Sequence, residues 1–148
     1  MKTIRNLGAA LAVCLPTSAL AQELPPFEST MDRSFEAYRY ERCAALHMSV
    51  IAWLVQDNLG PDTFRAFSMR YQEFHEAAAR VYENHGDTSF DVGWDRATAT
   101  IEAIRELYLS EFRALYASTG SRDVFESEPF SGDFEVCSDY YHSLRNSQ

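Results

Sequence analysis

Glycine and proline are scarce in this chain, which has six glycines and five prolines in 148 residues. Such a composition argues against a loop-rich all-β fold. The glycines are also too widely separated to form a phosphate-binding glycine-rich loop or the G-x-S-x-G turn of serine hydrolases. Beyond Gly8 they stand at positions 60, 86, 93, 120 and 132. We therefore expect neither of these functional loops.

Lysine is nearly absent, and acidic residues outnumber basic ones. Lys2 is the only lysine, which leaves none in the body of the chain for Schiff-base catalysis. The formal net charge is −9, from 22 acidic and 13 basic residues. Because nucleic acids and anionic membrane surfaces attract basic proteins, we expect neither of them as a partner. Hydrophobic residues make up 46% of the chain, enough to bury the core of one domain.

The first 21 residues have the pattern of a secretory signal peptide. A basic start with Lys2 and Arg5 precedes the apolar run 7–15, and Ala19-Leu20-Ala21 provides the small residues of a cleavage site. The apolar run is too short to span a membrane, and no later stretch is long enough either. A lipoprotein modified at Cys14 is the rival, although Val13 is bulky for the position before it. We predict a signal peptide over 1–21, a single domain over 22–148, and a periplasmic or secreted protein.

Two cysteines remain after the predicted cleavage, Cys43 and Cys137. In an exported protein an even number of cysteines indicates disulfides, and two cysteines allow only one pairing. We therefore predict a Cys43–Cys137 disulfide. The alternative is a pair of free thiols, one of which acts as a nucleophile.

Apolar residues recur at helical spacing through most of the chain. The pattern predicts helices over 30–57, 61–85 and 92–118, with a short helix capped by Ser131-Gly132-Asp133 near the end. A capping-box pattern, Ser29 to Asp32, marks the expected start of the first helix, and Gly60-Pro61 separates the first two. We predict an all-α fold, an antiparallel bundle of three long helices plus a short C-terminal helix with one disulfide.

Two cofactor classes common in helical bundles lack their motifs here. Covalent haem attachment needs C-x-x-C-H, which is absent. Di-iron bundles need Glu-x-x-His twice, because residues three apart on a helix direct two ligands to one metal. The residues three positions before the four histidines are Ala44, Gln72, Tyr82 and Asp139. We expect no cofactor.

The histidines offer weaker candidates. His47 lies four residues after Cys43 on an apolar face, a spacing at which the two side chains could bind one metal ion. A disulfide at Cys43 would remove that ligand. We therefore expect His47 to be a core imidazole that is hydrogen-bonded to a tyrosine or a backbone carbonyl. Asp139 and His142 are three residues apart and could share a metal or a proton. His75 stands beside Glu73 and Glu76, and we interpret this cluster as a charged face with one histidine.

Aromatic residues are abundant, at 14% of the chain. Val124, Phe125, Pro129 and Phe130 lie in an acidic connection, where they form a lid over a groove or an exposed contact surface, or simply cover the end of the core. We favour the last of these interpretations. We predict a groove formed by Tyr40, His47, Phe125, Phe130 and Tyr141. The leading hypothesis is a non-catalytic binding or accessory protein that presents this groove to a protein or an apolar ligand. The alternative is a metal- or haem-binding bundle, or a small enzyme, using His47, His75 or Asp139/His142.

Overall fold

The computed structural model describes residues 24, 27, 36–55, 59–86 and 88–146. The predicted signal peptide and the capping box at Ser29–Asp32 lie outside these residues. Four α-helices make up most of the described chain: α1 (Glu36–Leu54), α2 (Pro61–His85), α3 (Phe90–Thr119) and α4 (Glu128–Asn146). A single 3-10 turn, η4 (Val124–Glu126), precedes α4. The described residues contain no strand, so the predicted all-α class is confirmed.

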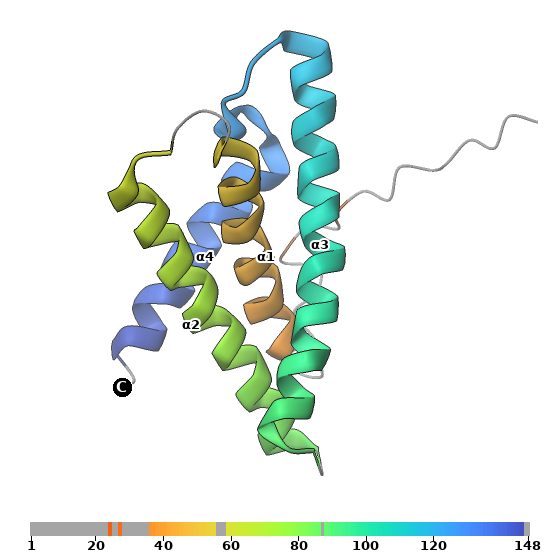
Figure 1. The fold of residues 1–148 in the computed structure, drawn as a ribbon, viewed down its shortest axis with the longest axis vertical. Helices are drawn as coiled ribbons and strands as arrows, with labels where there is room; N and C mark the ends of the chain where they lie inside the picture. Colours follow the sequence, from red (N-terminus) through yellow and green to blue (C-terminus); the bar gives the residue numbers. More distant parts are fainter. Residues whose placement is uncertain (1–23, 25–26, 28–35, 56–58, 87, 147–148) are drawn as a thin grey trace, which may run out of the picture.

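The helices run alternately up and down, and α1 lies at the centre (Figure 1). It packs against α2 and α3 along most of its length and is crossed by α4, which lies behind α1 and α2 in this view. The core consists of the inward residues of all four helices together with Leu24 and Phe27 from the N-terminal segment. No helix in the described part of the chain has both the length and the apolar character that a membrane span requires.

Local signals explain where the helices begin and end. Pro61 occupies the first turn of α2, where a missing N–H costs nothing. Ser89 caps α3 by accepting a hydrogen bond from the Val92 N–H, so this helix begins at Phe90, two residues before the predicted start. Gly120 ends it in the left-handed conformation at φ 73°, which favours glycine.

The last helix begins earlier than the sequence predicts. It starts at Glu128 instead of at the proposed cap Ser131-Gly132-Asp133, and at 19 residues it is as long as α1. Pro129 is tolerated because it falls in the first turn, where its missing N–H would have no partner within the helix. Asp133 does not cap a helix, because its carboxylate accepts hydrogen bonds from Arg42 and Tyr108 in the core. The predicted cap was therefore wrong.

Candidate functional site

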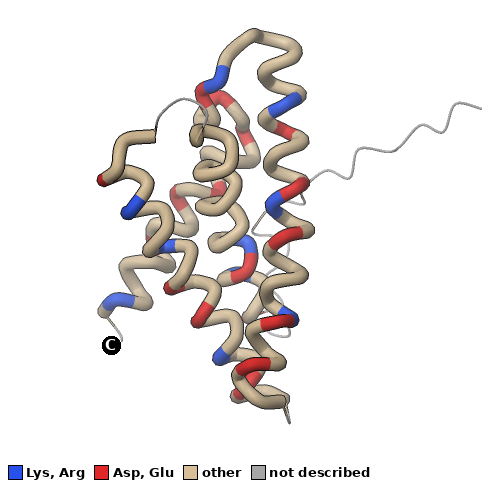
Figure 2. The backbone as a smooth tube through the Cα atoms, in the orientation of Figure 1, with Lys and Arg blue, Asp and Glu red and all other residues tan. Residues whose placement is uncertain are grey.

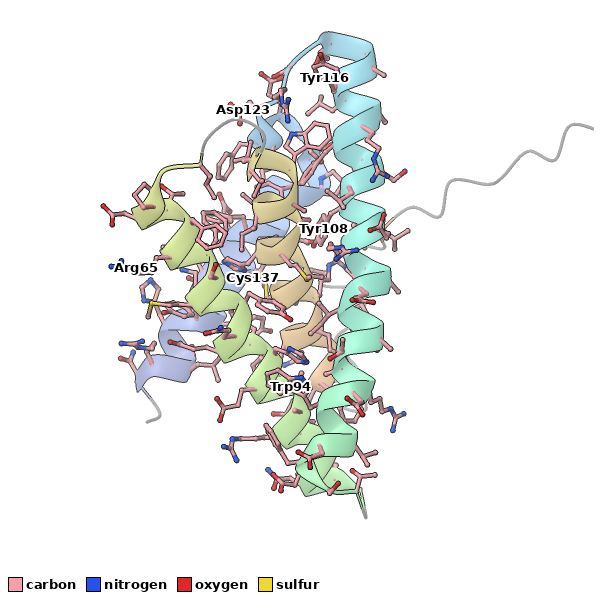
Figure 3. The ribbon with its side chains drawn as sticks, in the orientation of Figure 1. Arg65, Trp94, Tyr108, Tyr116, Asp123 and Cys137 are labelled. Atoms are coloured by element: carbon pink, nitrogen blue, oxygen red, sulfur yellow. A yellow bond between two sulfur atoms is a disulfide. The ribbon has the colours of Figure 1, made fainter. Side chains whose placement is uncertain are left out.

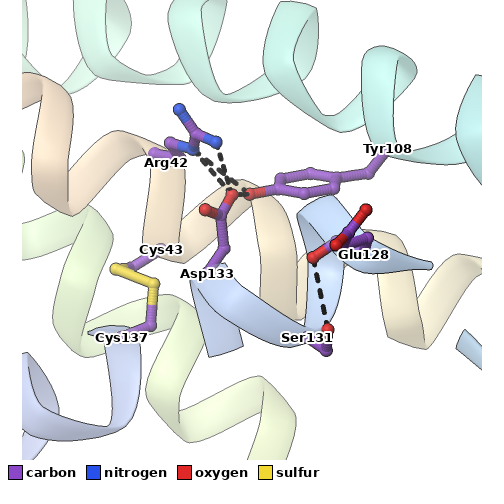
Figure 4. Close-up of polar contacts among 7 residues, drawn as sticks. All are labelled: Arg42, Cys43, Tyr108, Glu128, Ser131, Asp133 and Cys137. Atoms are coloured by element: carbon purple, nitrogen blue, oxygen red, sulfur yellow. Dashed lines mark hydrogen bonds and ion pairs between the residues drawn. A yellow bond between two sulfur atoms is a disulfide. The ribbon is translucent and has the colours of Figure 1, made fainter. Parts of the chain in front are cut away.

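A disulfide joins α1 to α4 at the point where the two helices cross. Cys43 and Cys137 are bonded, and their Cα atoms lie 5.4 Å apart (Figure 4). This confirms the predicted pairing and brings the first and last helices into contact. The bond also removes Cys43 as a metal ligand beside His47.

Beside the disulfide, a buried ion pair joins the same two helices. The Nε and Nη2 atoms of Arg42 each lie 2.7 Å from Oδ2 of Asp133 (Figure 4). The hydroxyl of Tyr108 on α3 donates to the same carboxylate oxygen. Arg42 is 1% exposed and Asp133 is 4% exposed. The three side chains therefore link α1, α3 and α4 away from water.

The electrostatics of this trio keep Arg42 charged and Tyr108 protonated. Burial opposes the charge on Arg42, but Tyr108 and Asp133 outweigh it and raise the arginine pKa. Burial raises the pKa of Tyr108 well above its ordinary value, and the neighbouring carboxylate raises it further. Burial also raises the pKa of Asp133, while the hydrogen bond from Tyr108 and the charge of Arg42 act in the opposite direction.

The ion pair lies at one side of a cleft of about 340 Å³. Phe27 forms part of its wall, with its ring centroid 5.0 Å from the guanidinium carbon of Arg42 and 6.0 Å from the Tyr140 ring. Residues from the N-terminal segment, α1 and α4 line the cleft: Leu24, Phe27, Arg42, Glu128, Pro129, Gly132, Asp133 and Val136. The volume falls at the lower end of the roughly 300–1,000 Å³ that small-molecule sites occupy.

Gly132 is open on its cleft side. A Cβ placed on this residue would meet no heavy atom within 4 Å. Because Gly132 also lines the cleft, a side chain at this position starts beside the cleft without a steric obstacle.

The five residues of the predicted groove are linked through ring contacts in the core. Phe125 and Phe130 are 5.2 Å apart, and Phe134 lies 5.2 Å from Phe125 and 6.2 Å from His47. Phe74 continues the series, with ring distances of 5.7 Å to His47, 6.0 Å to Tyr141 and 6.4 Å to Tyr40.

These five residues differ in their access to solvent. Phe130 and His47 are buried, Tyr40 and Tyr141 are half-buried, and Phe125 is 52% exposed. None of the five lines the 340 Å³ cleft. That they bind a ligand remains a prediction.

His47 is a core histidine, as its neighbours on the helix predict. It is 1% exposed, and its Nδ1 lies 2.7 Å from the carbonyl oxygen of Cys43. Because a carbonyl only accepts, Nδ1 carries the proton and Nε2 carries the lone pair. Nε2 is buried and has no hydrogen-bond partner among the described residues. Burial is the main cause that lowers the His47 pKa to about 4.

The sequence interpretation of His75 was wrong. Its side chain is 1% exposed and does not belong to the charged face, because position 75 falls on the inward side of α2 with Phe74 and Ala78. The Tyr71 hydroxyl lies 3.3 Å from Nδ1, and the Thr98 hydroxyl lies 3.1 Å from Nε2. Burial lowers the His75 pKa.

The two carboxylates that stand beside His75 in the sequence form ion pairs with other residues. Glu73 pairs with Arg145, and Glu76 pairs with Arg80.

The His75 ring lies away from the Arg42–Asp133 ion pair. Trp94, which stacks on the His75 ring with the ring centroids 3.7 Å apart, lies near the start of α3, whereas Tyr108 lies near its middle (Figure 3). The His75 cluster and the ion-pair cluster are therefore separate sites.

Asp139 and His142 are both exposed on α4. Among the residues that the structure describes, no three His, Cys, Asp or Glu side chains are grouped so that they could hold a metal ion.

Sequence reasoning missed the trio of Arg42, Tyr108 and Asp133. Arginine and aspartate are rarely buried, so composition and periodicity alone place both on the surface. A signal was nevertheless present. Arg42 immediately precedes Cys43, and Asp133 lies one helical turn before Cys137. Once the disulfide is placed, helical spacing brings the two charges to the same crossing.

No protein family model, no curated protein sequence and no solved structure matches this chain.

Proposed function

We propose that this protein is an exported, non-catalytic binding or accessory protein that accepts an apolar ligand in the cleft between the N-terminal segment, α1 and α4. The supporting observation is the cleft itself, whose apolar walls (Leu24, Phe27, Pro129 and Val136) adjoin a paired polar side formed by Arg42 and Asp133. Apolar walls with a few fixed polar groups are typical of small-molecule sites.

The buried trio of Arg42, Tyr108 and Asp133, which adjoins the cleft, favours a binding role over a catalytic one. A general acid or base needs a pKa near the working pH and a proton that it can exchange with the substrate. Tyr108 is buried with its pKa raised well above the ordinary value, and its proton is committed to Asp133. Oδ2 of Asp133 also accepts from Arg42. These groups stabilise one another and fix the shape of the site.

Ligand binding can be tested by filling the cleft. The Cβ of Gly132→Leu lies in open space at a residue that lines the cleft, so we expect the fold to be kept and the cleft to be narrowed. Phenylnaphthylamine, a neutral dye that fluoresces in apolar sites, is titrated into each protein. We expect saturable binding to the natural protein and at least tenfold weaker binding to Gly132→Leu.

The matched control is Ser110→Leu, which adds the same side chain at an exposed position of α3 outside the cleft. It should bind the dye like the natural protein. Thermal melts of both variants show that the folds are intact. Equal dye binding by Gly132→Leu and the natural protein would contradict a ligand site at this cleft.

Export is part of the proposal. The disulfide is compatible with an oxidising compartment. Intact mass of the protein made in its own cells should correspond to a chain that begins at Gln22. A lipidated chain that begins at Cys14 would place the protein on a membrane instead.

A metal- or haem-binding bundle is the second candidate, and one observation favours it. The Nδ1–H of His47 is fixed by the Cys43 carbonyl, which leaves Nε2 as a buried lone pair without a partner among the described residues. Ligating histidines are commonly oriented in this way. Visible absorbance and the metal content of the purified protein test the candidate. A stoichiometric metal or haem that is lost in His47→Phe would replace the apolar-ligand proposal.

A further inference from the structure

Among the described residues, three charged side chains line the cleft, and two of them neutralise each other. Arg42 and Asp133 form the buried ion pair, with the Arg42 Nη2 atom 2.7 Å from the Asp133 carboxylate. The third is Glu128, an exposed residue in the first turn of α4. Its carboxylate forms no ion pair within the described part of the chain. The described lining of the cleft therefore has one charge without an ion-pair partner among the described residues, and that charge is negative.

The segment that leads into Glu128 is acidic as well. Asp123 and Glu126 lie in the connection that leads from α3 into α4 (Figure 2). The basic residue of that connection, Arg122, is turned toward α1. Its Nη2 donates to the Trp53 carbonyl at 3.0 Å, and its guanidinium carbon lies 5.2 Å from the Trp53 ring centroid. Over 122–128 the chain has one arginine and three carboxylates, so this stretch carries a net negative charge, which attracts cations.

We propose that the cleft selects apolar molecules that carry a positively charged group, such as an alkylammonium. The apolar part lies against Leu24, Phe27 and Val136, and the cation lies beside Glu128. This inference rests on the proposed function and adds the chemical class of the ligand.

An anionic ligand is disfavoured, although Arg42 lines the cleft. The charge of Arg42 is already paired with the Asp133 carboxylate, so it offers an anion little net attraction. The ligand charge would also face Glu128.

The experiment displaces bound phenylnaphthylamine with three molecules of equal chain length: octylammonium, octanol and octanoate. At low ionic strength we expect octylammonium to displace the dye at concentrations about five- to tenfold lower than octanoate, with octanol between them. One close charge contact near a protein surface has an effect of about this size. Added salt should reduce the preference.

Glu128→Gln removes the charge at the cleft and should abolish the difference between octylammonium and octanoate. Glu126→Gln is the matched control, because it makes the same charge change in the same acidic segment but does not line the cleft. It should leave the preference within twofold of the natural protein.

The outcomes separate this inference from the function on which it rests. Equal displacement by the three molecules, or equal loss of preference in both variants, would overturn the selection for cations while the apolar cleft remained a binding site. Failure of the dye to bind the natural protein, or undiminished binding by Gly132→Leu, would overturn the proposed function itself.

Discussion

The two sides of α1 are held by different kinds of interaction. On one side, α2 and α3 pack closely against α1 and against each other, and Glu41 is buried there with the Tyr82 hydroxyl donating to it at 2.7 Å. On the other side, the next two residues of α1 attach α4 through an ion pair and a disulfide. The three-helix unit of α1, α2 and α3 rests on packing spread over many residues. The last helix, α4, adds an ion pair and a disulfide to the ring contacts that Phe130, Phe134 and Tyr141 make with the core.

The cleft lies on the α4 side of α1, where the ion pair and the disulfide act at one helix crossing. The cleft lies beside the ion pair, between α4 and Phe27. We therefore expect single changes at the links of α4 to have larger effects than changes in the packed unit, and changes at the cleft to have the smallest.

The largest effect should come from removing the disulfide. The bridge joins residues 94 positions apart, and the chain-entropy model gives up to roughly 4–5 kcal/mol for a loop of this length. That is a large share of the about 5–15 kcal/mol typical of a domain. We expect Cys43→Ala/Cys137→Ala to lower the free energy of unfolding by several kcal/mol, measured by denaturant titration.

Hydrogen exchange provides the regional test for the same variant. Amides of α4 should lose protection before those of α1, α2 and α3, because the links of α4 are the ones weakened. A uniform loss of protection over all four helices would show that α4 and the packed unit unfold together. The comparison between the two sides of α1 would then fail.

Breaking the ion pair should have the next largest effect. Asp133→Ala leaves the Arg42 charge buried at 1% exposure without its partner, and such changes cost about 3–5 kcal/mol. The measurement is the free energy of unfolding, with Asp139→Ala at an exposed site of the same helix as the control. The double variant Arg42→Met/Asp133→Leu should recover most of the loss, because apolar residues of similar size need no counter-charge.

How much of this attachment could be predicted from the sequence depends on the chemistry of each link. Cys43 and Cys137 were predictable, because two cysteines in an exported chain have one pairing and both lie on apolar stripes. The position of His47 followed from helical spacing in the same way. Arg42 and Asp133 were not predicted, because a charged residue is buried only when a tertiary partner compensates it, and periodicity does not contain that information.

The cleft could not be predicted from the sequence either. Its lining includes Leu24 and Phe27, which are far from α4 in sequence and outside any helical pattern. The aromatic residues proposed for a groove do contact one another, but mostly through buried rings. Their number indicated a rich core correctly, whereas the location of empty space depends on packing geometry.

The free energy of unfolding should also depend on pH through His47, which lies in the three-helix unit. Burial lowers the His47 pKa to about 4 from the 6.5 of a free histidine. The unfolded chain therefore binds a proton in this window more readily than the folded protein does, and stability falls as the pH drops from about 6.5 to 4. The difference of about 2.5 pKa units corresponds to about 3 kcal/mol. Glu41 and Asp133 act in the opposite direction, because burial raises the pKa of each.

The contribution of His47 is isolated by comparing variants. His47→Phe places a similar ring among Phe67, Phe74 and Phe134 and has no proton to gain. It should lose less stability than the natural protein between pH 7 and about pH 4, followed by denaturant titration at each pH. His142→Phe, at an exposed position, should retain the natural pH dependence. Identical pH profiles for His47→Phe and the natural protein would show that His47 is accessible to protons in the fold.

The smallest effects, and the most direct comparison of the two regions, come from a pair of glycines. A Cβ on Gly93 would lie 2.7 Å from the Ala79 carbonyl oxygen, because α2 and α3 approach each other there, whereas a Cβ on Gly132 meets nothing. Gly93→Ala should therefore lower the free energy of unfolding by about 1–3 kcal/mol through overpacking. Gly132→Ala should raise it by about 0.5–1 kcal/mol, because alanine loses less conformational entropy in a helix. Denaturant titration measures both, and each variant is the control for the other. Opposite signs are expected, because one glycine is required by close packing and the other borders empty space. A loss of stability in Gly132→Ala would mean that the cleft is closed in solution.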